Sequence, residues 1–274
     1  MPYINQNMKQ TNPISVTFDR NVYESILGPD KCKRPESNLE HAAIIANYIE
    51  WKQIVPYISE SAFTLETLRN EKGNRRRILT KDRKIISEPG DSFIRLGGDP
   101  SIHPGTTETD GYFLNKAIES GFKILPIFRF GRIVNLEIRP EWRYIKEYSE
   151  PMGLVDKWSE VVTYLEDLGA GFGFINSLLK IPENRQKPWT FYAEQYTGSD
   201  KKFNRAIAEW SDGDSVASHI ASGITYFCTY DEAKGAGSKS VFSPNIKEAL
   251  NKKFGLKVVS PQELVFILQG HLPA

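Results

Sequence analysis

Acidic side chains follow several apolar, β-prone segments of this sequence, and they are the residues best suited to chemistry. Asp19 comes directly after ISVTF, Glu60 directly after IVPYIS, and Asp231 two residues after ITYFCT. In open parallel sheets, ligands bind outside the carboxyl ends of the strands. If these strands are neighbours, we expect their acids to converge on one edge of a sheet.

More acids are expected near the same edge. Glu66 lies over a turn into the helix predicted after IVPYIS, and Asp212 and Asp214 precede a short predicted helix. Clustered carboxylates raise each other's pKa, and a hard divalent cation such as Mg²⁺ or Mn²⁺ relieves this repulsion. For any single acid the alternative is a turn residue or a helix cap. The predicted metal ligands are Asp19, Asp231, Asp214 and Asp212, with Glu66 in the same catalytic site.

Strand-like and helical segments alternate at both ends of the chain, which predicts an α/β fold with a parallel sheet covered by helices on both faces. Pro56 suggests an edge or irregular position for its strand. His219 is expected to be a partly buried, hydrogen-bonded histidine. The predicted strands are 14–18, 54–59, 224–229 and 256–260, and the predicted helices include 39–53, 61–71, 203–210, 215–223 and 245–255.

The middle of the chain has a different character. It is rich in loops, with a predicted hairpin and two predicted helices. We interpret 71–202 as a region of mixed α and β structure inserted into one α/β core formed by 14–70 and 203–268. No internal repeat is found.

Four segments carry a resemblance to a known family. VTFDRNVY, YISESAFTLETL, HIASGITYFCTYD and LKVVSPQEL resemble, in this order, the motifs of PIN-domain nucleases. The resemblance implies a three-layer α/β/α sandwich and metal-dependent cleavage of RNA or flap-like nucleic acid. Asp19 and Asp231 would then be metal ligands, and Asn21 and Thr229 would orient them. Glu66 matches the helical glutamate of the family better than Glu60, which is expected beside the site.

The sequence departs from the family pattern at the third acid. Val216 and Ala217 occupy the positions expected for it, near the start of the predicted 215–223 helix. Asp214 or Asp212, slightly upstream, would have to substitute. This departure favours an alternative function, in which a catalytically weakened PIN-like domain binds nucleic acid or protein without cutting.

Two basic segments are candidates for holding phosphates. Residues 69–84 contain eight Lys and Arg against two acids, and residues 122–148 interleave arginines with aromatic side chains. Arginine for phosphate and aromatic rings for stacking suit single-stranded nucleic acid. The alternatives are a solvated hairpin and core aromatics. The candidate nucleic-acid-binding residues are Arg75, Arg77, Arg129 and Arg132.

Composition restricts the function only weakly. The chain has 274 residues with 35 Lys and Arg against 34 Asp and Glu, so its net charge of +1 favours no particular partner. Its two cysteines, Cys32 and Cys228, give neither a disulfide framework nor a Cys-based zinc site, and a reducing cytoplasm is the default. No signal-peptide h-region or membrane-length apolar run is found.

Together these features predict a metal-dependent endoribonuclease that hydrolyses phosphodiester bonds with metal-activated water. The resemblance also implies a toxin-type ribonuclease controlled by an antitoxin-like protein. A phosphatase of doubly wound type is the remaining alternative, and the absence of Asp-x-Asp after the first strand argues against it.

Overall fold

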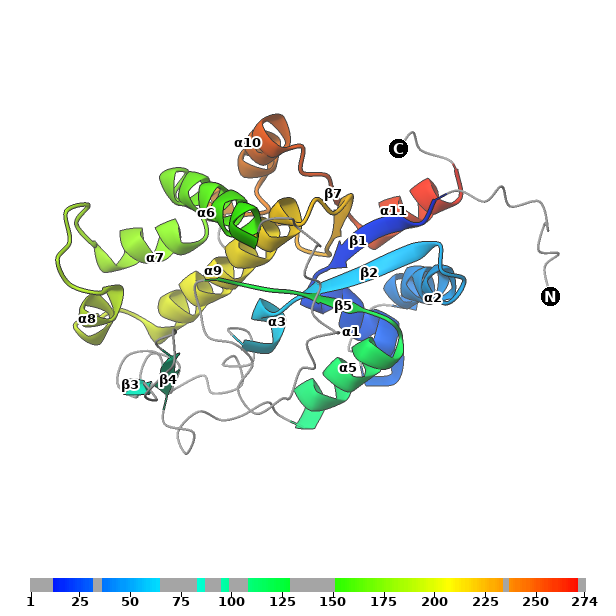
Figure 1. Ribbon diagram of the computed structural model, residues 1–274, viewed down its shortest axis with the longest axis horizontal. Coiled ribbons are helices and arrows are strands. Elements are labelled where there is room, and N and C mark those ends of the chain that lie inside the picture. Colours follow the sequence, from blue (N-terminus) through cyan, green and yellow to red (C-terminus); the bar gives the residue numbers. More distant parts are fainter. Residues whose placement is uncertain are drawn as a thin grey trace.

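A parallel sheet of five strands forms the centre of this computed structural model (Figure 1). The model describes residues 12–31, 36–64, 83–86, 95–98, 108–128, 151–233 and 237–270. The strand order is β5-β2-β1-β6-β7, and every neighbouring pair is parallel. The strands are β1 (Ile14–Phe18), β2 (Ile54–Ser59), β5 (Lys123–Leu125), β6 (Tyr226–Cys228) and β7 (Val258–Val259). The predicted α/β fold with a parallel sheet is confirmed.

Helices cover both faces of the sheet, because strand residues alternate between two apolar cores. Val16 and Phe18 of β1 belong to the first core, and Phe227 of β6 belongs to the second. The first core is completed by α1 (Arg20–Leu27), α2 (Glu36–Glu50), α3 (Ser61–Thr64), α5 (Glu108–Glu119) and α11 (Pro261–Leu268). The second is completed by α6 (Pro151–Asp167), α9 (Asp200–Ala221) and α10 (Pro244–Phe254).

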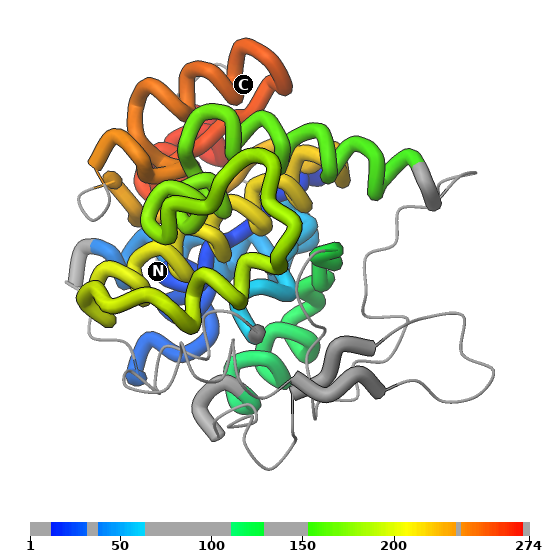
Figure 2. The backbone as a smooth tube through the Cα atoms, turned by 90° about the vertical axis from the view of Figure 1, so that its left-hand side faces the viewer, coloured from blue at the N-terminus to red at the C-terminus, as the bar shows by residue number. Residues whose placement is uncertain are grey.

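Two further helices extend the second layer. Helices α7 (Phe172–Leu179) and α8 (Trp189–Glu194) share a third apolar core with the N-terminal half of α9 (Figure 2). Its centre is aromatic: the ring centroids of Phe172 and Trp210 lie 4.8 Å apart, and those of Trp189 and Trp210 lie 5.4 Å apart. Two short 3-10 helices are also present: η1 (Pro29–Lys31) follows α1, and η4 (Gly237–Lys239) precedes α10. Strands β3 (Arg83–Ile86) and β4 (Arg95–Gly98) form a second, antiparallel sheet.

The connections run in opposite directions from the middle of the sheet. From β1 the chain proceeds outward to β2 and β5, then returns to β6 on the other side of β1 and proceeds outward to β7. The order therefore reverses between β1 and β6. Such a switch point is where open α/β sheets bind ligands, outside the carboxyl ends of the strands.

One predicted helix boundary is wrong. Residues 203–210 and 215–223 were expected to form separate helices, but they belong to α9, a single helix of 22 residues. Gly213 lies inside this helix, at a close crossing with Gly171. A Cβ atom built on Gly213 would lie only 3.0 Å from the Cα of Gly171. The glycine therefore serves helix packing and does not end the helix.

Of the two positions that Pro56 suggested, an edge or an irregular one, the edge is wrong, since β2 lies between β1 and β5. Pro56 is tolerated because pairing with β5 begins only at the next residue, Tyr57. The missing N–H of Pro56 therefore leaves the paired stretch with β5 intact.

The region predicted as an insertion contributes to the main sheet and core. Strand β5 pairs with β2, and Phe113, Leu114 and Ala117 of α5 are buried in the first core. Among the residues described, no helix is both long and apolar enough to cross a membrane.

Candidate functional site

Asp19 lies at the switch point between β1 and β6. Its backbone N–H donates to the carbonyl of Cys228 at 2.9 Å, so the pairing of β1 with β6 continues up to the aspartate. Its side chain caps α1, because Oδ1 accepts a hydrogen bond from the backbone N–H of Arg20 at 2.7 Å. Its Oδ2 accepts from Asn21 Nδ2 and from Thr229 Oγ1, both at 2.6 Å.

Asn21 and Thr229 connect Asp19 to Asp231. The Thr229 hydroxyl accepts from the backbone N–H of Asp231 at 2.9 Å, and Asn21 Oδ1 accepts from the backbone N–H of Tyr230 at 3.1 Å. The Asp231 Oδ1 atom accepts from the backbone N–H of Ala233 at 2.6 Å, an Asx-type turn. The same two polar side chains thus contact Asp19 and the backbone that carries Asp231.

The two aspartates repel each other electrostatically. Burial raises the pKa of Asp19, and the charge of Asp231 raises it further. The hydrogen bonds from Thr229, Arg20 and Asn21 act in the opposite direction, but burial is the largest effect. A cation placed between the carboxylates would relieve both the burial of charge and the repulsion.

Glu209 of α9 is a third acid of this region, and no sequence motif marks it. Its side chain is only 5% exposed, and Oε2 accepts a hydrogen bond from the backbone N–H of Val241 at 3.0 Å. Burial raises the pKa of Glu209 to about 7, and the charge of Asp231 contributes in the same direction. In the sequence, Glu209 resembles any polar position of an amphipathic helix.

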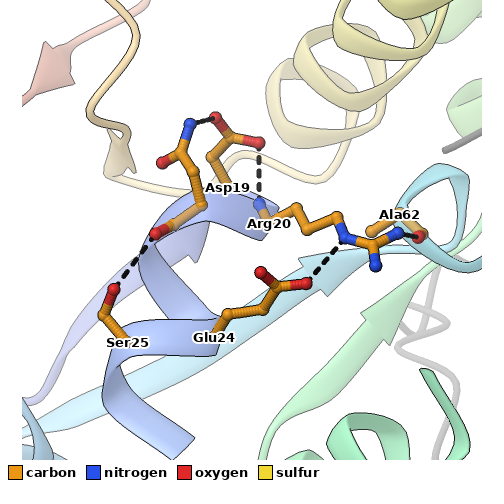
Figure 3. A network of polar contacts seen from close by, with 6 residues as sticks. Asp19, Arg20, Glu24, Ser25 and Ala62 are labelled. Atoms are coloured by element: carbon orange, nitrogen blue, oxygen red, sulfur yellow. Dashed lines mark hydrogen bonds and ion pairs between the residues drawn. The ribbon is translucent and has the colours of Figure 1, made fainter. Parts of the chain in front are cut away.

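Arg20 was also missed, and it ties the start of α1 to the end of the neighbouring strand (Figure 3). Its Nε lies 2.7 Å from Glu24 Oε1, and its Nη1 donates to the carbonyl of Ala62 at 3.1 Å. Ala62 belongs to α3, which follows β2 directly. The signal available in the sequence was the i, i+4 spacing of Arg20 and Glu24.

The remaining predicted acids lie on other elements near this edge. Asp214 and the partly buried Asp212 are inside α9, and Asp214 is 1% exposed. Ser215, the residue after Asp214, hydrogen-bonds Ser61 directly beyond β2, so α9 carries Asp214 past the carboxyl ends of the strands. Glu60 is buried after β2, where its backbone N–H donates to the carbonyl of Leu125 at 2.9 Å.

The oxygen donors fit a hard cation that retains much of its water. Mg²⁺ in proteins is held by one or two carboxylates together with water and substrate phosphates. Asp19 and Asp231 provide two such carboxylates from adjacent strands. No group of three His, Cys, Asp or Glu side chains suited to a metal ion occurs in the part of the chain that the structure describes. The candidate ligands for such a cation are therefore the two carboxylates of Asp19 and Asp231.

Several predicted site residues lie outside the described ranges. These are Glu66, the predicted helical glutamate, and the candidate phosphate-binding residues Arg75, Arg77, Arg129 and Arg132.

Comparison with family models, with curated proteins and with solved structures gives no match for this chain. The sheet, its switch point and the Asp19–Asp231 pair are thus the observations from which a function can be argued.

Proposed function

We propose that this protein is a PIN-like, metal-dependent nuclease that hydrolyses phosphodiester bonds in RNA. The observation that carries the proposal is the pair of aspartates, Asp19 and Asp231, at the switch point between β1 and β6. The two are joined through Thr229 and Asn21 and repel each other electrostatically. A buried aspartate with a raised pKa, as Asp19 is, favours at such a position a functional site over an ordinary turn.

The proposed chemistry divides between the aspartates and the side chains that hold them. Asp19 and Asp231 would hold Mg²⁺ or Mn²⁺, which when bound supplies a Lewis acid for a phosphodiester and makes water a better nucleophile. Asn21 and Thr229 fix the orientation of Asp19 through hydrogen bonds at 2.6 Å. Arg20 holds the α1 terminus against α3, so it would position Asp19 indirectly.

A cleavage assay with single-stranded RNA tests this proposal. Wild-type protein is expected to cut with Mg²⁺ or Mn²⁺ and to stop on addition of chelator. Asp231→Asn is the sharpest variant, because Asn retains an Oδ1 acceptor for Ala233 and loses only the charge. We expect its rate to fall by about 100-fold or more, since the metal contributes several kcal/mol of charge stabilisation.

The matched control for this assay is Asp167→Asn, at the end of α6, where Asp167 is exposed. It removes the same charge and should retain the wild-type rate. Equal cleavage by wild type and Asp231→Asn, or cleavage that persists in chelator, would contradict the proposal.

A second candidate function is a binding module for nucleic acid or protein that needs no metal. It is favoured by the Asp19 carboxylate itself, because both of its oxygens already accept hydrogen bonds from Arg20, Asn21 and Thr229. Titration with Mn²⁺ separates the two functions. A nuclease is expected to bind Mn²⁺, and Asp231→Asn is expected to bind it more weakly. A binding module is expected to bind no Mn²⁺, so wild type and Asp231→Asn would behave alike.

A further inference from the structure

Helix α9 extends beyond the carboxyl ends of the strands and carries α7 and α8 with it. Along α9, His219 contacts Thr17 within β1, Ser215 contacts Ser61 beyond β2, and Glu209 contacts Val241 in the loop that precedes α10. The N-terminal turns of α9 therefore lie beyond the edge at which Asp19 and Asp231 meet. Helices α7 and α8, which share the third apolar core with this part of α9, therefore extend beyond the same edge.

Two exposed cations lie on the segments that contact Glu209, the acid whose pKa is raised by the charge of Asp231. Arg205 is one helical turn before Glu209 on α9, and its charge lowers the pKa of Glu209. Lys239 is the last residue of η4, and the next two residues, Ser240 and Val241, both hydrogen-bond to Glu209. Both side chains are exposed, which leaves them available to a ligand.

An aromatic ring lies beside Lys239, one of these two cations. The Nζ atom of Lys239 lies 5.5 Å from the ring centroid of Phe174, a half-buried residue of α7. Cations for phosphates and a ring on which a base can stack form the combination that holds single strands without sequence preference. We call Arg205, Lys239 and Phe174 the basic-aromatic surface.

We propose that the basic-aromatic surface seats single-stranded RNA next to the Asp19–Asp231 pair. The inference rests on the proposed function and specifies its substrate as a single strand. Two phosphates would contact Arg205 and Lys239, and one base would stack on the Phe174 ring. Exposed Lys201, one turn before Arg205 on α9, extends the cationic track away from the carboxylates.

The opposite end of the sheet provides a matched control. Lys253, near the end of α10, lies 4.1 Å from the ring centroid of Tyr164, and Lys157 of α6 lies 4.7 Å from that of Phe254. Helix α10 ends at Phe254, and the chain then enters the amino end of β7. These pairs repeat the lysine-on-aromatic contact, but they lie away from the carboxyl ends of the strands.

The experiment measures binding of a labelled oligouridylate in chelator, where no metal-dependent cleavage occurs, across a salt series. Arg205→Gln with Lys239→Gln should lower the slope of log affinity against log salt by about 1.4, since each phosphate contact on a single strand contributes about 0.7. Lys157→Gln with Lys253→Gln removes the same charge and should leave the slope unchanged. Phe174→Leu should weaken binding by about tenfold with little change in slope, because stacking involves no counterion.

Equal slopes for the two double variants would overturn the inference, as would the absence of any binding by the wild type. An acidic protein is the other class of ligand that such cations attract, and failure to bind RNA would direct the search there. These outcomes are separate from the proposed nuclease, because Mn²⁺-dependent cleavage that is lost in Asp231→Asn would stand whichever surface holds the strand.

Discussion

Helix α9 makes two kinds of buried polar contact, and they differ in charge. Its C-terminal half contacts the strands through neutral pairs, His219 with Thr17 at 2.8 Å and Ser218 with the carbonyl of Pro126 at 2.7 Å. We call these contacts the neutral seam. Its N-terminal half brings Glu209 toward Asp231 at the carboxyl edge, where the charge of Asp231 raises the pKa of both Glu209 and Asp19.

The difference shows which buried polar groups serve the fold. In the neutral seam each donor faces an acceptor, so burial is compensated and the contacts fix how α9 lies on the sheet. At the carboxyl edge, burial and like charge both oppose ionisation, so the acids reduce stability unless a cation arrives. Features that cost stability persist mainly at functional sites.

The largest effect on stability is expected in the neutral seam. His219→Leu leaves the buried Thr17 hydroxyl without its partner and should destabilise the protein by about 2–3 kcal/mol, as measured by urea denaturation. Thr17→Val alone should cost about 1–3 kcal/mol for the same reason. The double variant should recover much of the loss, since both polar groups are then removed. Simple addition of the two losses would show that the pair is not coupled.

The lowered pKa of His219 predicts that the stability of the protein depends on pH. Burial lowers the pKa of His219 to about 3, so the fold tolerates only the neutral ring. Its contribution is present above the ordinary pKa of about 6.5 and is lost as the pH falls from there toward 3, by about 1.4 kcal/mol per pH unit. The stability advantage of wild type over His219→Leu should therefore shrink as the pH falls and reverse before pH 3 is reached.

Much of the sheet could be predicted from the sequence because its local signals agree with one another. The segments around Asp19 and Asp231 are short, apolar and β-branched or aromatic, and each is followed by turn chemistry. The capping box of Ser260 and Glu263 is present at the start of α11, where the sequence indicates it. The predicted hydrogen bond of His219 is likewise confirmed, while its burial, at 1% exposure, is more complete than predicted.

Features that depend on contacts between distant segments could not be predicted. Helix α1, which Asp19 caps, was not among the predicted helices. The continuity of α9 through Gly213 depends on Gly171, which is far away in the sequence. Glu209 becomes part of the candidate site only through Val241 and Asp231, and its own neighbours in sequence reveal nothing of this.

At the carboxyl edge, removal of an acid should stabilise the metal-free protein. Glu209→Gln keeps an oxygen that accepts from Val241 but cannot ionise. Because the pKa of Glu209 is raised to about 7, its favourable contribution is full below its ordinary value of about 4.5 and is lost as the pH rises through 7. The variant should therefore exceed wild type at about pH 8 by up to about 3 kcal/mol, and the two should converge near pH 4.

The control for that result is Glu209→Ala, which removes the charge and the acceptor together. The buried N–H of Val241 then lacks its partner, so Ala should be less stable than Gln by about 1–3 kcal/mol at every pH. If Glu209→Gln is less stable than wild type at high pH, Glu209 stabilises the fold, as the contacts of the neutral seam do.

The smallest effect is expected for Asp231→Asn without metal. Asn keeps the acceptor for Ala233 and removes a charge that raises the pKa of Asp19. The variant should therefore melt at or slightly above the wild-type temperature, and its free energy of unfolding should rise by about 1 kcal/mol or less. Added Mn²⁺ should reverse the order, since it stabilises only the protein that binds it. Thermal melting of both proteins with chelator and with Mn²⁺ gives the comparison. If Asp231→Asn melts well below wild type in chelator, Asp231 stabilises the turn at Ala233, and the contrast between the carboxyl edge and the neutral seam disappears.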